Sequence, residues 1–127
     1  MSDVNEVLRE VLDATEFVAI VTQGPDGPHV VGNWGDYIRK LGPTSDTIVI
    51  PAGGYQQTEK NLASDPRIQL LVASREVQGS QGPGQGCTIH GTAELVTDGP
   101  VVDEVKQHFP WARGALVMAI EEVLPHL

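Results

Sequence analysis

Residues 49–61, VIPAGGYQQTEKN, combine residue types that could bind a phosphate group. An apolar strand runs into Gly53 and Gly54, which lack a Cβ and so let a ligand approach the backbone. The polar residues that follow open a helix, whose free backbone amides favour an anion. The Thr58 hydroxyl could cap this helix, its commoner role, or bond to a phosphate oxygen. The segment therefore predicts an anion site that has no lysine ahead of Thr58.

Three aromatic side chains could line a site for a planar ligand. Trp34 and Tyr37 stand among glycines and charged residues in GNWGDYIRK, residues 32–40, and Trp111 lies in FPWARG. The chain has only two Trp, two Tyr and two Phe, so three of them in turn-like contexts favour an aromatic binding site. Coverage of the edges of the core is the equally weighted alternative.

Metal and hydrolase chemistry find little support. The four histidines show no paired spacing, and the single cysteine, Cys87, completes no metal set. Neither Ser74 nor Ser80 lies in a Gly-x-Ser-x-Gly elbow. The glycines of residues 79–86, GSQGPGQG, run into a strand instead of opening a helix, so we expect a surface loop and not a dinucleotide-binding turn. No catalytic or metal-binding residue is predicted.

Composition bounds the class of protein. A chain of 127 residues with 40% apolar and 20% charged content suits one domain spanning residues 1–127. Its net charge of −9 repels nucleic acid and anionic membranes, so neither is expected as a partner. A lone cysteine permits no internal disulfide, and the start MSDVNEVLRE has neither a basic leader nor an apolar signal. No apolar run approaches the roughly 20 residues of a membrane helix, so we expect a cytoplasmic protein.

The elements that must position these residues follow from the spacing of apolar side chains. Apolar residues recur at three- and four-residue intervals from Val4 to Leu12 and predict a helix, with Ser2 as a candidate N-cap. Consecutive strands joined by hairpins, without regular helical crossovers, predict an α+β fold with a mainly antiparallel sheet or barrel. Further helices are expected at 58–65 and 99–109, and strands in a hairpin over 17–34 and at 46–52, 67–74, 87–97 and 115–123.

Several segments together resemble a known family. They are VAIVTQGPDGPHVVGNWGDYIRK, IVIPAGGYQQTEKN, GSQGPGQG, TDGP and WARGALV. In this order they are similar to the small FMN-binding proteins of sulfate-reducing bacteria, members of the pyridoxamine 5'-phosphate oxidase-like split-barrel superfamily. The likeness covers nearly the whole chain from about residue 7. It implies a six-stranded split β-barrel, a homodimer, and one non-covalent FMN per subunit near the dimer interface.

The resemblance also implies roles for single residues around the phosphate. Asn33, Gln57 and Thr58 would lie at the phosphate of FMN. Gly53 and Gly54 would lie along the flavin.

The flavin ring would have an aromatic surround. The resemblance implies that Trp34, Tyr37 and Trp111 surround the isoalloxazine, and that Leu127 reaches the flavin of the partner subunit. The expected cofactor-binding set is completed by Gly32, Pro51 and Ala52.

Two residues depart from the family pattern. The family has lysine where this chain has Gln57, and asparagine where it has Gly32. Losing a charge-assisted bond to phosphate would cost roughly 1 to 3 kcal/mol, about one to two decades in affinity. FMN remains the expected cofactor because the backbone amides, Thr58 and ring burial persist, while a weaker site or another flavin-like ligand stays open. Cations that could compensate are Arg39, Lys40, Lys60 and Arg75.

Three classes of function follow from this resemblance. The first is a flavoprotein that carries electrons or hydride on FMN for an unknown redox partner protein or small-molecule substrate. The second is a split-barrel oxidoreductase that acts on a defined small substrate or uses a deazaflavin, and the third is a non-enzymatic flavin-binding module. The first is our leading hypothesis, and whether the protein is an enzyme stays open.

Overall fold

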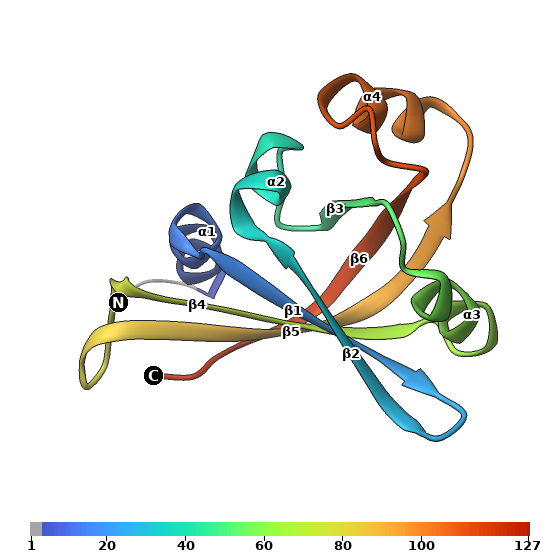
Figure 1. The fold of residues 1–127 in the computed structure, drawn as a ribbon. Helices are drawn as coiled ribbons and strands as arrows, with labels where there is room; N and C mark the ends of the chain where they lie inside the picture. The colour runs from blue at the N-terminus through green and yellow to red at the C-terminus, as the bar shows by residue number, and fades with distance from the viewer. Residues whose placement is uncertain (1–3) are drawn as a thin grey trace.

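The computed structural model describes residues 4–127, so the candidate N-cap Ser2 lies outside the described residues. Six strands and four helices follow one another along this range (Figure 1). The helices are α1 (Val4–Ala14), α2 (Gly35–Lys40), α3 (Gln56–Ser64) and α4 (Pro100–His108). The strands are β1 (Phe17–Gly24), β2 (Gly27–Trp34), β3 (Thr47–Ala52), β4 (Arg67–Gly79), β5 (Gly82–Val96) and β6 (Gly114–Pro125).

All six strands form one antiparallel sheet in the order β2-β1-β4-β5-β6-β3. The sheet twists and curls, so that β3 and β6 rise away from β1 and β2 (Figure 1). The main core lies on one face of β3 and β6, and α4 packs on the other face. Because β2 and β3 end the order, the sheet has two edges and forms a half-barrel. The predicted α+β split-barrel with a mainly antiparallel sheet is confirmed.

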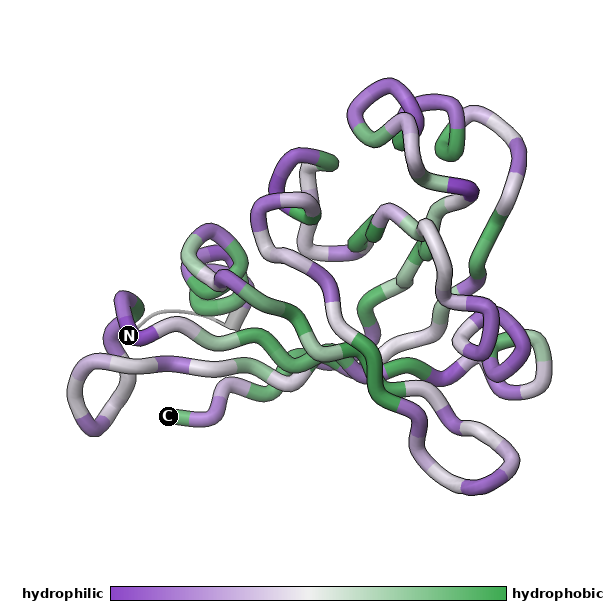
Figure 2. Tube along the Cα trace, in the orientation of Figure 1, coloured by the Kyte–Doolittle hydropathy of each residue, from purple (hydrophilic) through white to green (hydrophobic). Residues whose placement is uncertain are grey.

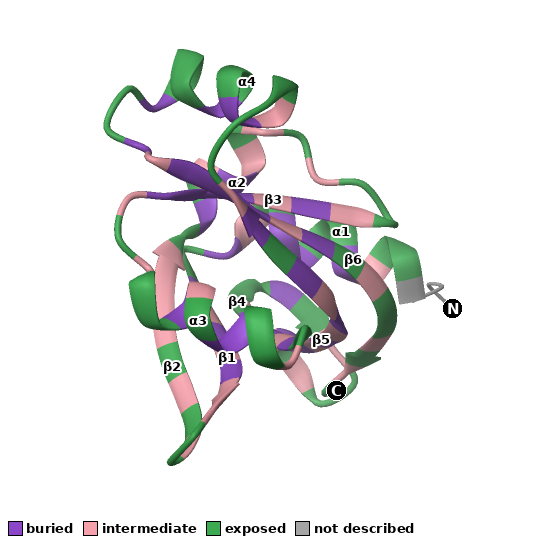
Figure 3. Ribbon diagram, turned by 90° about the vertical axis from the view of Figure 1, so that its right-hand side faces the viewer, coloured by how far each residue is buried: buried purple, intermediate pink, exposed green. Residues whose placement is uncertain are grey.

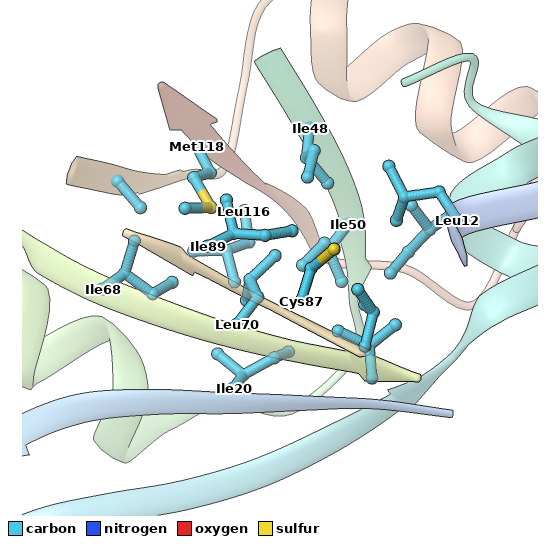
Figure 4. Packing of buried hydrophobic residues seen from close by; sticks show 14 of the residues in the cluster. Leu12, Ile20, Ile48, Ile50, Ile68, Leu70, Cys87, Ile89, Leu116 and Met118 are labelled. Atoms are coloured by element: carbon cyan, nitrogen blue, oxygen red, sulfur yellow. The ribbon is translucent and has the colours of Figure 1, made fainter. Parts of the chain in front are cut away.

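One face of the sheet is directed into the main apolar core. In β1, Val18 and Ile20 are fully buried while Ala19 between them is partly exposed, because successive side chains of a strand point to opposite faces. Figure 4 shows the core side chains of β1, β3, β4, β5 and β6 meeting in this interior. Figure 2 shows apolar residues along the strands and hydrophilic ones at the hairpin turn and the outer surfaces of helices. Cys87 belongs to this core, and burial raises the pKa of its thiol to about 11.

A second, smaller apolar cluster lies beneath α4. Val102 and Val105 of this helix are buried in it together with Phe109, and Tyr37 of α2 packs against it. The outer surface of α4 is exposed, as Figure 3 shows. This cluster fixes α2, α4 and the turn after α4 relative to one another, and that turn carries Trp111.

The helix α2 was missing from the predicted elements. It begins at Gly35, directly after β2. With only six residues, α2 is too short to show a periodic apolar pattern. Tyr37, expected in a turn-like context, therefore lies on a helix. Of the helices within residues 4–127, none has the length and apolar character needed to cross a membrane.

The glycine-rich segment 79–86 is not the surface loop that we predicted. β4 and β5 continue into it, and Gly79 pairs with Gly82 at the end of the ladder. Gly82 and Gly84 have φ values of 125° and 115°, which residues with a side chain rarely adopt. The glycines here build a twisted hairpin, which residue types with low strand propensity do not predict.

Candidate functional site

The junction between β3 and α3 presents glycine backbone at the surface. β3 ends at Ala52, and Gly54 has open space where a side chain would stand. Arg113, the residue before β6, lies against this segment: its backbone N–H donates to the Ala52 carbonyl at 2.8 Å, and its Nε donates to the Gly54 carbonyl at 2.9 Å. The junction is therefore held from the side of β6, and its outer edge remains accessible to a ligand.

The start of α3 leaves polar groups available. Tyr55 precedes the helix in the left-handed conformation, with φ 62°, and its side chain makes no capping bond. The first intrahelical bond runs from the Glu59 N–H to the Tyr55 carbonyl, so the amides before it face the helix end. Thr58 is fully buried, and its Oγ1 has no hydrogen-bond partner within residues 4–127. A buried hydroxyl without a partner is costly unless a ligand satisfies it.

Thr58 does not cap the helix, although capping is the commoner role of a threonine at a helix start. α3 begins at Gln56, two residues earlier than predicted, so Thr58 is the third helical residue and Tyr55 occupies the N-cap. The hydroxyl is thereby released from capping. This is the arrangement that leaves it free to bind something else.

Arg113 supplies a positive charge that the sequence analysis missed. Its Nη2 lies 3.0 Å from Glu59 Oε1, yet the contact lacks the angles of a hydrogen bond, and this buried atom has no such partner in the described part of the chain. Two of the cations named as compensators are used elsewhere: Arg39 donates to the Leu12 and Thr15 carbonyls, and Lys40 lies over the Phe109 ring. No local signal in the sequence points to Arg113, because the residues it contacts, Gly54 and Glu59, lie far from it along the chain.

Gln57 turns along α3. Its side chain is exposed, and its Nε2 donates to Asn61 Oδ1 at 2.8 Å. Asn61 is buried and donates in turn to Thr22 Oγ1 of β1 at 3.0 Å. Gln57 is thus the outer member of a chain of hydrogen bonds that joins α3 to the sheet.

Asn33 and Tyr55 connect the end of β2 with the junction. The Tyr55 hydroxyl donates to the Gly32 carbonyl at 2.6 Å and accepts from Asn33 Nδ2 at 2.8 Å. Asn33 Nδ2 also donates to the Pro51 carbonyl at 3.2 Å, and its Oδ1 accepts from the Trp34 N–H at 2.7 Å. Burial raises the pKa of the Tyr55 phenol, while the bond from Asn33 acts in the opposite direction. Both donors of Asn33 Nδ2 are therefore committed within the chain.

Gly32 cannot carry a side chain in this arrangement. A Cβ at Gly32 would stand 2.1 Å from the ring of Phe17, on the neighbouring strand β1. The asparagine that the family resemblance implies here would require the Phe17 ring to move. Glycine at position 32 is therefore explained by the Phe17 ring, which occupies the space of a side chain there.

The aromatic residues fall into two groups. Tyr37 and Trp111 have ring centroids 5.9 Å apart, and a Cβ on Gly53 would lie 3.1 Å from the Trp111 ring. Trp34 instead packs edge-on against Phe17, with centroids 6.0 Å apart. Trp34 and Tyr37 nevertheless both line an open cleft of about 490 Å³ between the end of α1 and α2.

Leu127 lies apart from the rest of the expected site. Its backbone N–H and carbonyl both bond to the side chain of Gln85, at 2.9 Å and 2.6 Å, beside the hairpin of β4 and β5. Figure 1 shows this C-terminus at the opposite end of the sheet from α3. The side chain of Leu127 is 52% exposed. Within one chain, Leu127 does not join the residues of the junction.

The geometry fits an anionic ligand with a ring better than a metal. Residues 4–127 contain no cluster of three or more side chains that could ligate a metal ion. The junction instead offers a buried hydroxyl, a guanidinium and the start of a helix, which together suit a phosphate. Aromatic rings lie over Gly53 and along the neighbouring cleft.

Comparison with known proteins places this chain. Residues 4–126 match the family model of pyridoxamine 5'-phosphate oxidase. The chain belongs to this family. The family resemblance found in the sequence is thereby confirmed.

Individual known proteins are also similar to this chain. An FMN-binding protein of Nitratidesulfovibrio vulgaris is 45% identical over 111 residues, which are 87% of this chain and 88% of that protein. Among solved structures, HupZ of Group A Streptococcus has a TM-score of 0.72 at 16% identity, covering 97% of this chain and 99% of the other. An FMN-binding protein from Syntrophomonas wolfei has a TM-score of 0.66 at 18% identity, covering 98% and 86%. These two likenesses support the split-barrel fold alone.

Proposed function

We propose that this chain is a single-domain cytoplasmic flavoprotein that binds one FMN non-covalently per subunit of a homodimer and acts in redox or electron transfer. One observation carries the FMN assignment: Thr58, in the first turn of α3, has a fully buried hydroxyl without a partner in the described range. The 45% identical relative that carries the name FMN-binding protein supports the same assignment.

The binding roles follow from the geometry of the junction. The Thr58 hydroxyl and the backbone amides at the start of α3 bind the phosphate, and Gly53 and Gly54 let the flavin approach the backbone. Trp111, packed over Gly53, covers one side of the bound ring.

The cleft beside α2 extends this site. Trp34 and Tyr37 line it and contact the isoalloxazine, as the family resemblance implies. Asn33 and Pro51, joined by a hydrogen bond, hold the β2 and β3 ends together at the edge of the site.

When bound, FMN supplies one- and two-electron redox chemistry, and the protein supplies position, shielding from water and electrostatics. No side chain needs to act as a general acid or base for electron transfer. A second function, oxidation or reduction of a small substrate, is favoured by the open cleft. Besides its two aromatic residues, this cleft is lined by Glu16, Asp36 and Arg39, polar groups that could orient such a molecule.

The first test is whether the protein binds FMN. We expect protein purified without added cofactor to show flavin absorbance, or to bind FMN in calorimetry at about one per chain. Reduction of the bound flavin by electron donors, followed in the same spectrum, then separates a redox protein from a storage module. A colourless protein that gives no heat of binding with tens of micromolar FMN would contradict the assignment.

A further inference from the structure

We propose that Arg113 is the cation that binds the FMN phosphate, in place of the positive charge that is absent at Gln57. This inference rests on the proposed FMN binding and deepens it. In this proposal, the positive charge of the anion site comes from the residue before β6 and not from α3.

Two hydrogen bonds fix where the Arg113 guanidinium lies. The backbone N–H donates to Ala52 and Nε donates to Gly54, so the side chain runs along the glycine edge of the junction. Its Nη2 then reaches Glu59, the residue that follows Thr58 in α3. The guanidinium is thus held at the first turn of the helix.

Two polar atoms at this turn lack a hydrogen-bond partner, although one of them is ion-paired with Glu59. Thr58 Oγ1 is buried on α3, and Arg113 Nη2 is buried beside Glu59, the next residue of the helix. Neither atom has a hydrogen-bond partner within residues 4–127. A phosphate oxygen accepts from both a hydroxyl and a guanidinium, and it also suits the amides of a helix start. One ligand of this class would satisfy both groups.

Gln57 is poorly placed to take this role. Its amide nitrogen already donates to Asn61, and this bond belongs to the chain that ends at Thr22 of β1. Turning the Gln57 side chain toward a phosphate would leave buried Asn61 Oδ1 without its donor. The Gln57 amide is therefore committed to α3 and not to a phosphate.

Glu59 sets the strength of the site. Its carboxylate lies 3.0 Å from Arg113 Nη2, so it competes with a phosphate for the guanidinium and repels the anion. Replacing Glu59 by glutamine removes both effects and should strengthen FMN binding. The Arg113–Glu59 contact is thus a tuning contact of the site.

The test compares FMN with riboflavin, which lacks the phosphate. We expect Arg113→Gln to raise the dissociation constant for FMN about 5- to 100-fold and to leave that for riboflavin within about twofold. The matched control is Arg67→Gln, which removes an arginine paired with Asp65 just after the other end of α3. The control should leave the affinities for both flavins unchanged.

Three outcomes would overturn the role of Arg113. These are an Arg113→Gln protein that binds FMN as tightly as the parent, one that loses both flavins equally, and a control that weakens FMN as much as Arg113→Gln does. If the parent protein binds neither flavin, the FMN proposal itself is refuted. This result differs from the three outcomes that refute only the role of Arg113.

Two further variants decide the matter if Arg113→Gln fails to fold. Glu59→Gln should bind FMN several-fold more tightly with riboflavin unchanged, and equal or weaker FMN binding would contradict the proposal. Arg113→Lys keeps the charge without the Nε bond to Gly54, so it should retain the preference for FMN over riboflavin. Loss of that preference would likewise contradict the proposal.

Discussion

At the scale of single residues, Tyr55 joins the start of α3 to the end of β2 at the proposed FMN site. Its backbone adopts a left-handed conformation just ahead of α3, and its hydroxyl bonds to both Gly32 and Asn33 at the end of β2. A left-handed backbone at a non-glycine residue is strained by of the order of 1 kcal/mol and persists where surrounding contacts enforce it. The two hydrogen bonds of the phenol are such contacts.

We predict that Tyr55→Phe lowers the free energy of unfolding by about 1 to 2 kcal/mol. The change leaves the Gly32 carbonyl without its donor and one N–H of Asn33 without its acceptor. Urea denaturation without cofactor measures the effect. Tyr37→Phe is the matched control, because the Tyr37 hydroxyl makes no hydrogen bond within residues 4–127, and it should change stability by less than about 0.5 kcal/mol. Equal effects of the two changes would contradict the prediction.

The contribution of Tyr55 depends on pH in a defined direction. Burial raises its pKa above the ordinary value of 10.0, so the unfolded chain loses this proton first as the pH rises. The folded state then binds more protons than the unfolded state, and stability falls with increasing pH. The advantage of the parent over Tyr55→Phe should therefore be complete below about pH 10 and diminish above it. A constant advantage between about pH 8 and about pH 11 would show that the phenol is not desolvated.

At the scale of elements, α3 is attached to the sheet by a polar contact within its buried face. Asn61 donates to Thr22 of β1 and accepts from Gln57, while Leu62 on the same face enters the main core. Buried amides must be hydrogen-bonded to be tolerated, so the Asn61–Thr22 bond fixes the helix in one position. That position sets the start of α3, and with it Thr58.

We expect Asn61→Ala to destabilise the protein by about 1 to 3 kcal/mol, because it opens a small cavity and leaves Thr22 Oγ1 unpaired. It should also weaken FMN binding through the displaced helix start. Ser64→Ala is the control: it changes an exposed side chain at the end of the same helix and should cost less than about 0.5 kcal/mol. Urea denaturation and FMN titration of both variants give the comparison. An Asn61→Ala protein as stable as the parent would show that apolar packing alone positions α3.

The sequence was informative about elements wherever apolar periodicity could be seen. It predicted α1, α4 and all six strand centres, because their apolar spacing is strict. It missed α2, whose six residues are too few to show a period, and it took the glycine hairpin of β4 and β5 for a loop, because glycine lacks strand propensity.

Single residues of the site were only partly accessible from the sequence. Thr58 and the glycines of the junction carry a local signal in the spacing of strand, glycine and helix. Arg113 does not, because it reaches Gly54 and Glu59 from a distant part of the chain, and only the fold brings these residues together. The rotation of Gln57 toward Asn61 likewise depends on where α3 docks on β1. Tertiary contacts of this kind cannot be read from spacing.

At the scale of the whole molecule, the outer face of the sheet carries exposed apolar side chains. Pairing aligns Gly32, Ala19, Leu71, Thr88 and Leu124 in one row across β2, β1, β4, β5 and β6. Leu71 and Leu124 in this row are each 44% exposed, and Phe17, which covers Gly32, is 50% exposed. Exposed leucine and phenylalanine side chains on one face of a sheet are typical of an interface between proteins.

We propose that a second copy of the chain covers this face, as the family resemblance implies. A two-fold arrangement brings the same patch of each subunit into contact, so each apolar row packs against its equivalent. The C-terminus borders this face, since Leu124 belongs to the row and the bonds to Gln85 hold Leu127 just beyond it. The half-exposed side chain of Leu127 is then presented to the partner, where the resemblance implies that it meets the flavin.

Leu71→Glu should therefore convert the protein from a dimer to a monomer. A carboxylate at the centre of the row would have to be desolvated in each subunit, which costs several kcal/mol. Because the flavin site is shared in this arrangement, FMN affinity should fall together with dimerisation. Sedimentation equilibrium at tens of micromolar gives the oligomeric state, and FMN titration of the same samples gives the affinity.

Ala63→Glu provides the matched charge control for this variant. Ala63 lies on the exposed face of α3, so the new carboxylate stays in water and should leave both the dimer and its FMN binding intact. Leu71 points away from the core, so we expect Leu71→Glu to fold. Circular dichroism checks this. A parent that is monomeric with FMN fully bound would refute the shared site. A folded Leu71→Glu dimer would instead move the interface to another surface.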